Sequence, residues 1–222
     1  MASSPVPVVD RTIEVPTEFG PARAHLRTPS GPVVGRLVLG HGAGGGIEAP
    51  DLVAARAAAV GQGWQVVLVE QPWRVAGKRV APAPARLDVG WLAVLAALSS
   101  SHDPGRPLVL GGRSAGARVA CRTALELGAR AVCCLAFPLH PPGRPERSRA
   151  AELGAPPAAG MPVLVVQGEQ DPFGAPAELT ALALPGVQVV GVPGNHTLAR
   201  TSAGSTAVAT AVAAGLSGWG QE

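Results

Sequence analysis

The chain has 222 residues and a formal net charge of +3, and 47% of its residues are hydrophobic while 15% are charged. This composition excludes a disordered chain, and one domain of this length buries roughly 70% of its unfolded surface, so it needs no disulfide. The small net charge and the scattered arginines argue against nucleic-acid binding. Three cysteines without metal-ligand spacing indicate reduced, packed thiols, so we expect neither a metal nor a cofactor.

The N-terminal stretch MASSPVPVVDRTIEVP lacks the charged and apolar regions of a signal peptide, and no segment is apolar over the length of a membrane span. We therefore expect a cytoplasmic protein without membrane association. These patterns do not determine its oligomeric state.

The hydrophobic pattern predicts the elements in chain order. Residues 11–15 and 22–28 alternate like an antiparallel hairpin with its turn at 19–21. Continuous apolar runs, which are typical of strands covered on both faces, then predict six strands at 35–40, 64–70, 107–112, 131–137, 161–168 and 187–192. Alanine-rich segments predict helices at 49–61, 84–100, 115–128, 175–184 and 202–217. The alternation indicates an α/β fold, with a doubly wound, mostly parallel sheet of about eight strands and helices on both faces.

Residues 138–160 interrupt this alternation. The segment PLHPPGRPERSRAAELGAPPAAG is too rich in proline, glycine and arginine for one ordinary helix. We interpret it as a lid-like insertion within a single domain of residues 1–222.

Ser114 lies where a predicted strand meets a predicted helix. It is the central residue of Gly112-Arg113-Ser114-Ala115-Gly116, which has the form GxSxG. A nucleophile on a tight, strained turn needs neighbours without bulky side chains, and the two glycines supply that room. Because the chain contains 29 glycines, the string alone is weak evidence, and its place between strand and helix carries the prediction.

A serine hydroxyl needs a general base, and the position of the five histidines separates them. Ligands of an open parallel sheet lie beyond the C-terminal ends of its strands. His196 follows the last predicted strand, whereas His102 precedes a strand and His25 falls within the hairpin. We therefore expect His196 to be the base.

The base needs an orienting acid, which should follow the strand at 161–168. Asp171 lies on a turn three residues after Gly168 in VVQGEQDPFG. Glu169 is the alternative carboxylate, although it lies closer to the strand. We expect Asp171 to be the acid.

An acyl-transfer site also needs two donors for the oxyanion. The amide of Ala115 is free at the start of a helix, where the helix dipole favours negative charge. The loop LGHGAGGGIEAP, after the first predicted parallel strand, can supply the amide of Ala43. A glycine-rich loop can also hold phosphate, but HGAGGG lacks the Lys-Ser/Thr pair of a P-loop and the spacing of a dinucleotide fingerprint.

The stretches VLGHGAGGG, GGRSAGARVA, QGEQDPFG and GNHTLA resemble the α/β-hydrolase fold family over nearly the whole chain. The chain looks like a group of small bacterial hydrolases similar to dienelactone hydrolases, a group related to a domain of a eukaryotic histone-acetyltransferase complex subunit. The resemblance implies Ser114 as nucleophile, Asp171 as acid, His196 as base, and the Ala43 and Ala115 amides as oxyanion hole, in the chain order Ser, Asp, His. Dienelactone hydrolases use a cysteine nucleophile, so the serine favours ester over lactone chemistry.

Two further stretches, QPWRVAGKR at 71–79 and FPLHPPGRPERSR at 137–149, resemble sequences of that group and follow strand ends, where they would border a pocket. They predict substrate contacts, with arginines suited to a carboxylate or phosphate, at Trp73, Arg74, His140, Arg144 and Arg147. Alternatively, the prolines stiffen a solvated loop that the arginines keep soluble. The sequence leaves both interpretations open.

These residues predict a serine hydrolase of the carboxylesterase type that forms an acyl-enzyme with a small-molecule acyl substrate. One alternative is a non-catalytic interaction module that docks through residues 138–160. Another is perhydrolysis of short carboxylic acids on the same three residues.

Overall fold

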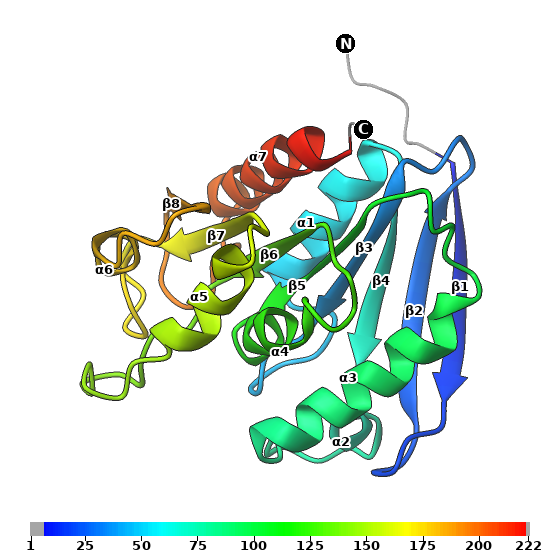
Figure 1. Cartoon of the computed structure of the whole chain (residues 1–222), viewed down its shortest axis with the longest axis horizontal. Helices are drawn as coiled ribbons and strands as arrows, with labels where there is room; N and C mark the ends of the chain where they lie inside the picture. The colour runs from blue at the N-terminus through cyan, green and yellow to red at the C-terminus, as the bar shows by residue number, and fades with distance from the viewer. Residues whose placement is uncertain (1–6, 221–222) are drawn as a thin grey trace.

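The computed structural model describes residues 7–220, and its strands form one eight-stranded sheet in the order β1-β2-β4-β3-β5-β6-β7-β8 (Figure 1). The strands are β1 Val8–Val15, β2 Ala22–Pro29, β3 Gly35–Gly40, β4 Trp64–Glu70, β5 Leu108–Arg113, β6 Ala131–Leu135, β7 Val163–Gly168 and β8 Val187–Val192. Strand β2 is antiparallel to both β1 and β4, and the other neighbouring pairs are parallel. This sheet confirms the predicted fold class and the predicted hairpin.

Helices cover both faces of the sheet, as Figure 1 shows. Buried side chains of β3, β4 and β7 pack with α1 and α7 in one core, and those of the opposite strand faces pack with α3, α4 and α5 in a second core. Every residue of β3, β6 and β7 is buried, which explains their continuous apolar runs. The helices are α1 Pro50–Gly61, α2 Pro72–Val75, α3 Pro84–Ser99, α4 Ala115–Thr123, α5 Ala150–Ala158, α6 Pro176–Ala181 and α7 Ser202–Trp219.

The segment 138–160 is less irregular than its composition indicates, because its second half forms helix α5 despite Pro156 and Pro157. The two prolines remove backbone donors, but tertiary contacts compensate. Leu153 is fully buried, and Glu152 binds Arg118 of α4 through two hydrogen bonds of 2.6 and 2.7 Å. The irregular part is therefore confined to the residues before α5.

Three other helices also differ from the sequence pattern, among them α6, which ends at Ala181 instead of residue 184. The short helix α2 was not predicted, and α4 ends at Thr123 instead of continuing to residue 128. The α4 helix gives way to turns that lead to Gly128, whose φ of 62° favours glycine. β3 and β7 end at the predicted residues and β5 ends one residue later, so the three strands finish at the edge that the pattern predicts.

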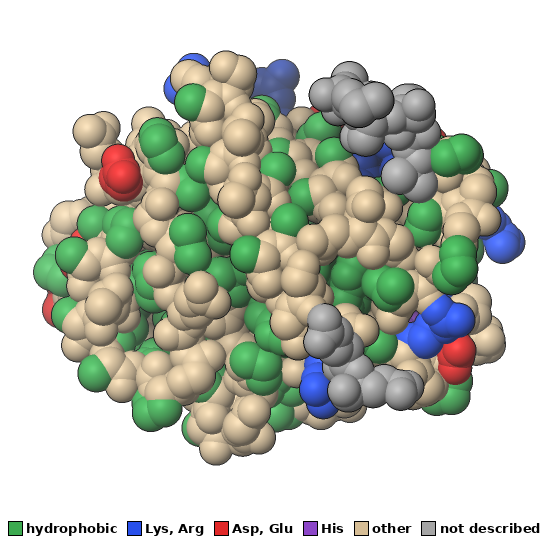
Figure 2. Space-filling model, turned by 90° about the horizontal axis from the view of Figure 1, so that it is seen from above, with side chains coloured by type: hydrophobic (Ala, Val, Ile, Leu, Met, Phe, Trp, Pro, Cys, Tyr) green, Lys and Arg blue, Asp and Glu red, His purple; other side chains and the backbone are tan. Residues whose placement is uncertain are grey.

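Within residues 7–220, no helix combines the length and apolar character needed to cross a membrane. On the face drawn in Figure 2, small hydrophobic side chains are mixed with polar atoms and backbone, and the Lys and Arg side chains are few.

Candidate active site

Ser114 occupies a sharp corner between β5 and α4. Its φ of 53° and ψ of −110° lie outside the regions that L-residues favour, a strain worth about 1–3 kcal/mol that the surrounding structure must sustain. The corner packs directly against β3, since a Cβ at Gly112 or Gly116 would overlap the backbone carbonyl of Gly40. The two glycines of GxSxG are thus required by close backbone contact, and they hold the serine at the start of a helix.

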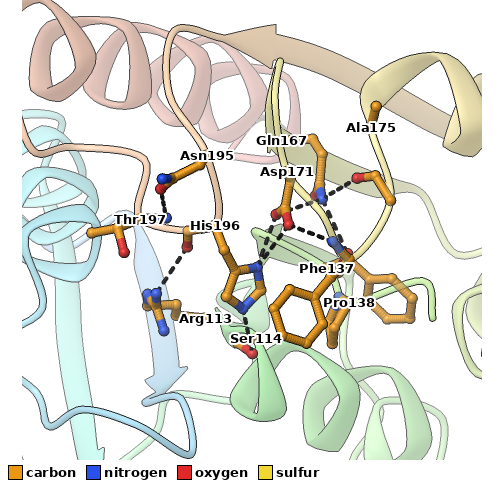
Figure 3. Close-up of polar contacts among 12 residues, drawn as sticks. Arg113, Ser114, Phe137, Pro138, Gln167, Asp171, Ala175, Asn195, His196 and Thr197 are labelled. Carbon is orange, nitrogen blue, oxygen red and sulfur yellow. Dashed lines mark hydrogen bonds and ion pairs between the residues drawn. The ribbon is translucent and has the colours of Figure 1, made fainter. Parts of the chain in front are cut away.

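His196 lies between Ser114 and Asp171 (Figure 3). Its Nε2 is 2.9 Å from Ser114 Oγ, and its Nδ1 is 2.9 and 3.1 Å from the two carboxylate oxygens of Asp171. Because the Asp171 carboxylate accepts a hydrogen bond from Nδ1–H, Nε2 keeps its lone pair facing the serine hydroxyl. The imidazole is therefore oriented to take the hydroxyl proton.

The Asp171 carboxylate is fully buried and held in place by neighbouring donors. Gln167 Nε2 donates to Oδ2 at 2.9 Å, and the Phe173 amide donates to Oδ1 at 2.9 Å. Gln167 is itself held by the carbonyls of Phe137 and Gly174. The rival carboxylate, Glu169, is exposed, and the hydrogen bonds of His196 Nδ1 within residues 7–220 go to Asp171.

A buried ion pair fixes the loop that carries His196. Arg113 donates through one nitrogen to the backbone carbonyl of His196 at 2.8 Å and through Nε to Asp51 at 2.9 Å. Burial raises the pKa of the fully buried Asp51 carboxyl, and the Arg113 guanidinium acts in the opposite direction. The Phe173 ring also lies against the imidazole, with ring centroids 4.2 Å apart.

Sequence reasoning missed Arg113, Asp51 and Gln167. Their signal was present as charged or amide groups within apolar elements: Arg113 ends a buried strand, Asp51 begins an alanine-rich helix, and Gln167 interrupts a valine run. Polar side chains in such places are buried only with partners.

The proposed oxyanion donors lie beside Ser114. Among residues 7–220, the backbone amides of Ala43 and Ala115 donate to no protein acceptor, and both residues line the cavity in front of the serine. The loop that carries Ala43 is fixed by His41, whose Nε2 accepts the Gln71 amide at 3.1 Å while Nδ1 donates to the Gly42 carbonyl at 2.9 Å. Burial lowers the pKa of His41, which favours this neutral tautomer.

A cavity of about 670 Å³ opens in front of Ser114. Its wall comes from the loop after β3, the start of α4, the turn after β7, the His196 loop and the segment before α5. The lining residues are Ala43, Gly44, Gly45, Gly46, Glu48, Ala49, Pro50, Arg113, Ser114, Ala115, Arg118, Pro138, Arg149, Phe173, His196 and Thr197.

The five predicted substrate contacts do not line this cavity. Trp73 is buried behind the Ala43 loop, with its ring centroid 5.4 Å from that of His41, and Arg74 lies beside Gly46. The remaining three belong to the segment before α5, where His140 is buried against Glu178 and two exposed arginines point to solvent, Arg144 and Arg147. That segment contributes Pro138 and Arg149 to the cavity instead.

A family model described as an alpha/beta hydrolase domain matches residues 34–215, from the residue before β3 to α7. No curated protein sequence matches the chain.

The chain is similar to solved structures over almost its whole length. An alpha-beta serine hydrolase homologue from Coxiella burnetii is 16% identical with a TM-score of 0.76, over 93% of this chain and 97% of that one. Protein XC6422 from Xanthomonas campestris, described as a serine hydrolase without lid, is 20% identical with a TM-score of 0.71, over 98% of both chains. Est1E from Butyrivibrio proteoclasticus is 17% identical with a TM-score of 0.72, over 94% and 98%. At these identities the likeness establishes the fold.

Proposed function

The chain belongs to the alpha/beta hydrolase domain family, and we propose that it is a serine hydrolase that cleaves a small ester or related acyl substrate. The observation that carries the proposal is the unbroken hydrogen-bond chain from Ser114 through His196 to Asp171, which opens onto a cavity beside two free amides. Nucleophile, base, acid and oxyanion donors come from four separate loops, and a protein that only binds a partner has no physical need to align them.

In the first half-reaction, His196 Nε2 takes the hydroxyl proton as Ser114 Oγ attacks the carbonyl carbon. The Ala43 and Ala115 amides stabilise the oxyanion of the tetrahedral intermediate, with help from the dipole of α4. Asp171 keeps Nδ1 protonated and stabilises the imidazolium that forms. Collapse of the intermediate expels the alcohol, which takes its proton from Nε2, and leaves an acyl group on Ser114.

In the second half-reaction, His196 removes a proton from a water molecule that attacks the acyl-enzyme. The same two amides stabilise the second intermediate, and Ser114 leaves with the proton from Nε2. The products are a carboxylic acid and the regenerated serine. No step needs a metal or a redox cofactor.

The proposal is tested by incubating the protein with a fluorophosphonate and measuring its intact mass. One adduct is expected on the wild type and none on Ser114→Ala. Ser148→Ala, which removes an exposed hydroxyl outside the cavity, is the matched control and should keep the adduct. Circular dichroism of each variant shows that it is folded.

A folded wild type without an adduct contradicts the proposal. The interaction-module alternative, which rests on the resemblance to a domain of a histone-acetyltransferase complex subunit, would then be tested by capture of partners on wild type and Ser114→Ala. Perhydrolysis is tested separately with hydrogen peroxide and acetate.

A further inference from the structure

Three arginines line the cavity, and they differ in what they bind. Arg113 pairs with the buried Asp51, and Arg118 makes two short hydrogen bonds to Glu152. Arg149 is half-buried, and its one side-chain hydrogen bond within residues 7–220 goes from Nη1 to the Pro138 carbonyl at 2.8 Å. Among the described residues, therefore, Arg149 is the cavity arginine without a carboxylate.

The charges around Arg149 do not balance. Glu152 binds both Arg118 and Arg122, and Asp88 binds Arg122 through two hydrogen bonds of 2.6 and 2.9 Å. Three guanidinium groups thus face two carboxylates, and the shortest contacts of both carboxylates go to the other two arginines. Burial lowers the pKa of Arg149, the nearby charges of Arg118 and Arg147 act in the same direction, and the charge of Glu152 only partly opposes them. The excess positive charge therefore lies on Arg149.

The unused edge of Arg149 has the shape of a carboxylate site. Arg27, Arg118 and Arg122 each bind a carboxylate in this protein through Nε and Nη2. In Arg149 neither of these two nitrogens has a partner within residues 7–220. A guanidinium presents its donors as a planar fork that matches two carboxylate oxygens, so the free edge can receive the same bidentate ligand.

Arg149 lines the same cavity as Ser114. The amide of Arg118 donates to the Ser114 carbonyl at 3.2 Å, which places Arg118 one helical turn after the nucleophile. Arg118 is near enough for its charge to lower the pKa of Arg149, and both arginines line the cavity with Ser114. The acidic residue of the lining, Glu48, belongs to the loop after β3 and lies beside Gly46. The charged side chains of the cavity lining are thus three arginines and one glutamate, besides His196.

From this arrangement we propose that the substrate carries a carboxylate in addition to the ester, and that Arg149 binds this carboxylate while the ester carbonyl lies at Ser114. The inference rests on the proposed hydrolase function and narrows its substrate class. The sequence analysis predicted substrate contacts at Arg144 and Arg147, which are exposed. The proposal assigns the carboxylate contact to Arg149 instead.

Matched esters that differ by one charge test the proposal. Monomethyl adipate is compared with dimethyl adipate, which places the charge on the acyl side, and 4-carboxyphenyl acetate is compared with 4-carbamoylphenyl acetate, which places it on the alcohol side. In at least one pair, kcat/KM of the wild type should favour the anionic ester by about 10- to 100-fold, as expected for a charge-assisted hydrogen bond. The favoured pair identifies the side of the ester that faces Arg149.

Arg149→Gln should abolish this preference mainly through a higher KM for the anionic ester. Arg147→Gln removes the same charge two residues away, outside the cavity, and should keep the preference. A purely structural role, in which Arg149 only fastens the segment through Pro138, would instead lower kcat/KM equally for both members of a pair.

Equal rates within both pairs for the wild type, or equal losses in Arg149→Gln, overturn the proposal while leaving hydrolysis itself intact. If no ester is cleaved, the proposal is tested without turnover by measuring the affinity of Ser114→Ala for each ester by calorimetry. The anionic ester of a pair must then bind more tightly than its neutral partner, and Arg149→Gln in the same background must remove the difference. The absence of that difference also overturns the proposal, whereas the fluorophosphonate experiment separately tests the hydrolase function.

Discussion

Two of the histidine–carboxylate pairs in this protein have the same N–O distance. His196 Nδ1 is 2.9 Å from Asp171, and His140 Nε2 is 2.9 Å from Glu178. Their surroundings differ, because the Asp171 carboxylate is fully buried whereas that of Glu178 is 48% exposed. A short contact between a histidine and a carboxylate therefore does not by itself distinguish a reactive pair from a structural one.

The second ring nitrogen makes the distinction. In His140, Nδ1 faces the carbonyl of Pro141 at 3.0 Å, so both nitrogens face acceptors and the ring must carry two protons to satisfy them. The Pro141 carbonyl, followed by Glu178, accordingly raises the pKa of His140. In His196 the second nitrogen faces the Ser114 hydroxyl, which can donate. The surroundings of His140 thus favour its cationic form, whereas His196 keeps a lone pair available for the proposed proton transfer.

The largest expected effect separates the two histidines directly. His196→Gln should lower kcat/KM for p-nitrophenyl acetate by about 10⁴-fold or more, because the serine loses its base. His140→Gln should change it by less than about twofold, because the ring lies outside the cavity and acts on no reacting atom. Similar losses of kcat/KM in both variants would contradict the different roles inferred for His196 and His140.

The next largest effect on kcat should distinguish the two carboxylates, Asp171 and Glu178. Asp171→Asn should lower kcat by about 10²–10⁴-fold, because the amide can donate to Nδ1 and move the histidine proton to Nε2. Glu178→Gln, at the exposed pair, should leave kcat within about twofold. Steady-state kinetics of both variants check this, and full activity of Asp171→Asn would contradict the orienting role.

The third prediction concerns the loop that holds His196 in place. Arg113→Met should destabilise the protein by about 3 kcal/mol, since Asp51 is left buried without its partner. It should also lower kcat by about 10-fold or more, because the His196 carbonyl loses its donor and the imidazole is less well positioned. Urea unfolding and kinetics measure the two effects.

The double variant Arg113→Met/Asp51→Asn separates these effects, because it removes the unpaired charge. It should recover part of the stability without recovering kcat. If kcat returned together with stability, the contact to the His196 carbonyl would have no positioning role.

The smallest effect is a pH dependence of stability from the His140 pair. Because the folded-state pKa of His140 is raised, its contribution is complete below its ordinary value of 6.5 and is lost as the pH rises through the folded-state pKa. Because the pKa of Glu178 is lowered, its contribution is present above 4.5 and is lost as the pH falls through the folded-state value. The pair therefore stabilises most between these two values.

Melting temperatures of wild type and His140→Gln across this range measure the contribution. Because Glu178 is exposed, the difference should be at most about 1–2 °C, greatest near about pH 5.5 and smaller at about pH 9. A difference that grew steadily towards high pH would have the wrong sign for this pair.

Much of the architecture could be predicted because local pattern and global fold agree in it. Buried parallel strands such as β3 and β7 must be apolar throughout, so their runs are visible in the sequence, and GxSxG between strand and helix marks the corner at which Ser114 lies. Helix α5 could not be predicted, because buried Leu153 and the Glu152–Arg118 ion pair outweigh the prolines only in the folded protein.

By itself, the sequence determined the α/β class, the order of the strands along the chain, and the residues that follow each strand end, because these depend on periodicity and local backbone chemistry. Tertiary structure decided which of those residues meet. Asp171 and Glu169 lie two positions apart in the chain, but only Asp171 binds His196. Arg149 and Arg147 also lie two positions apart, but only Arg149 lines the cavity. Side-chain direction depends on how a loop packs against distant elements, and no local pattern encodes that packing.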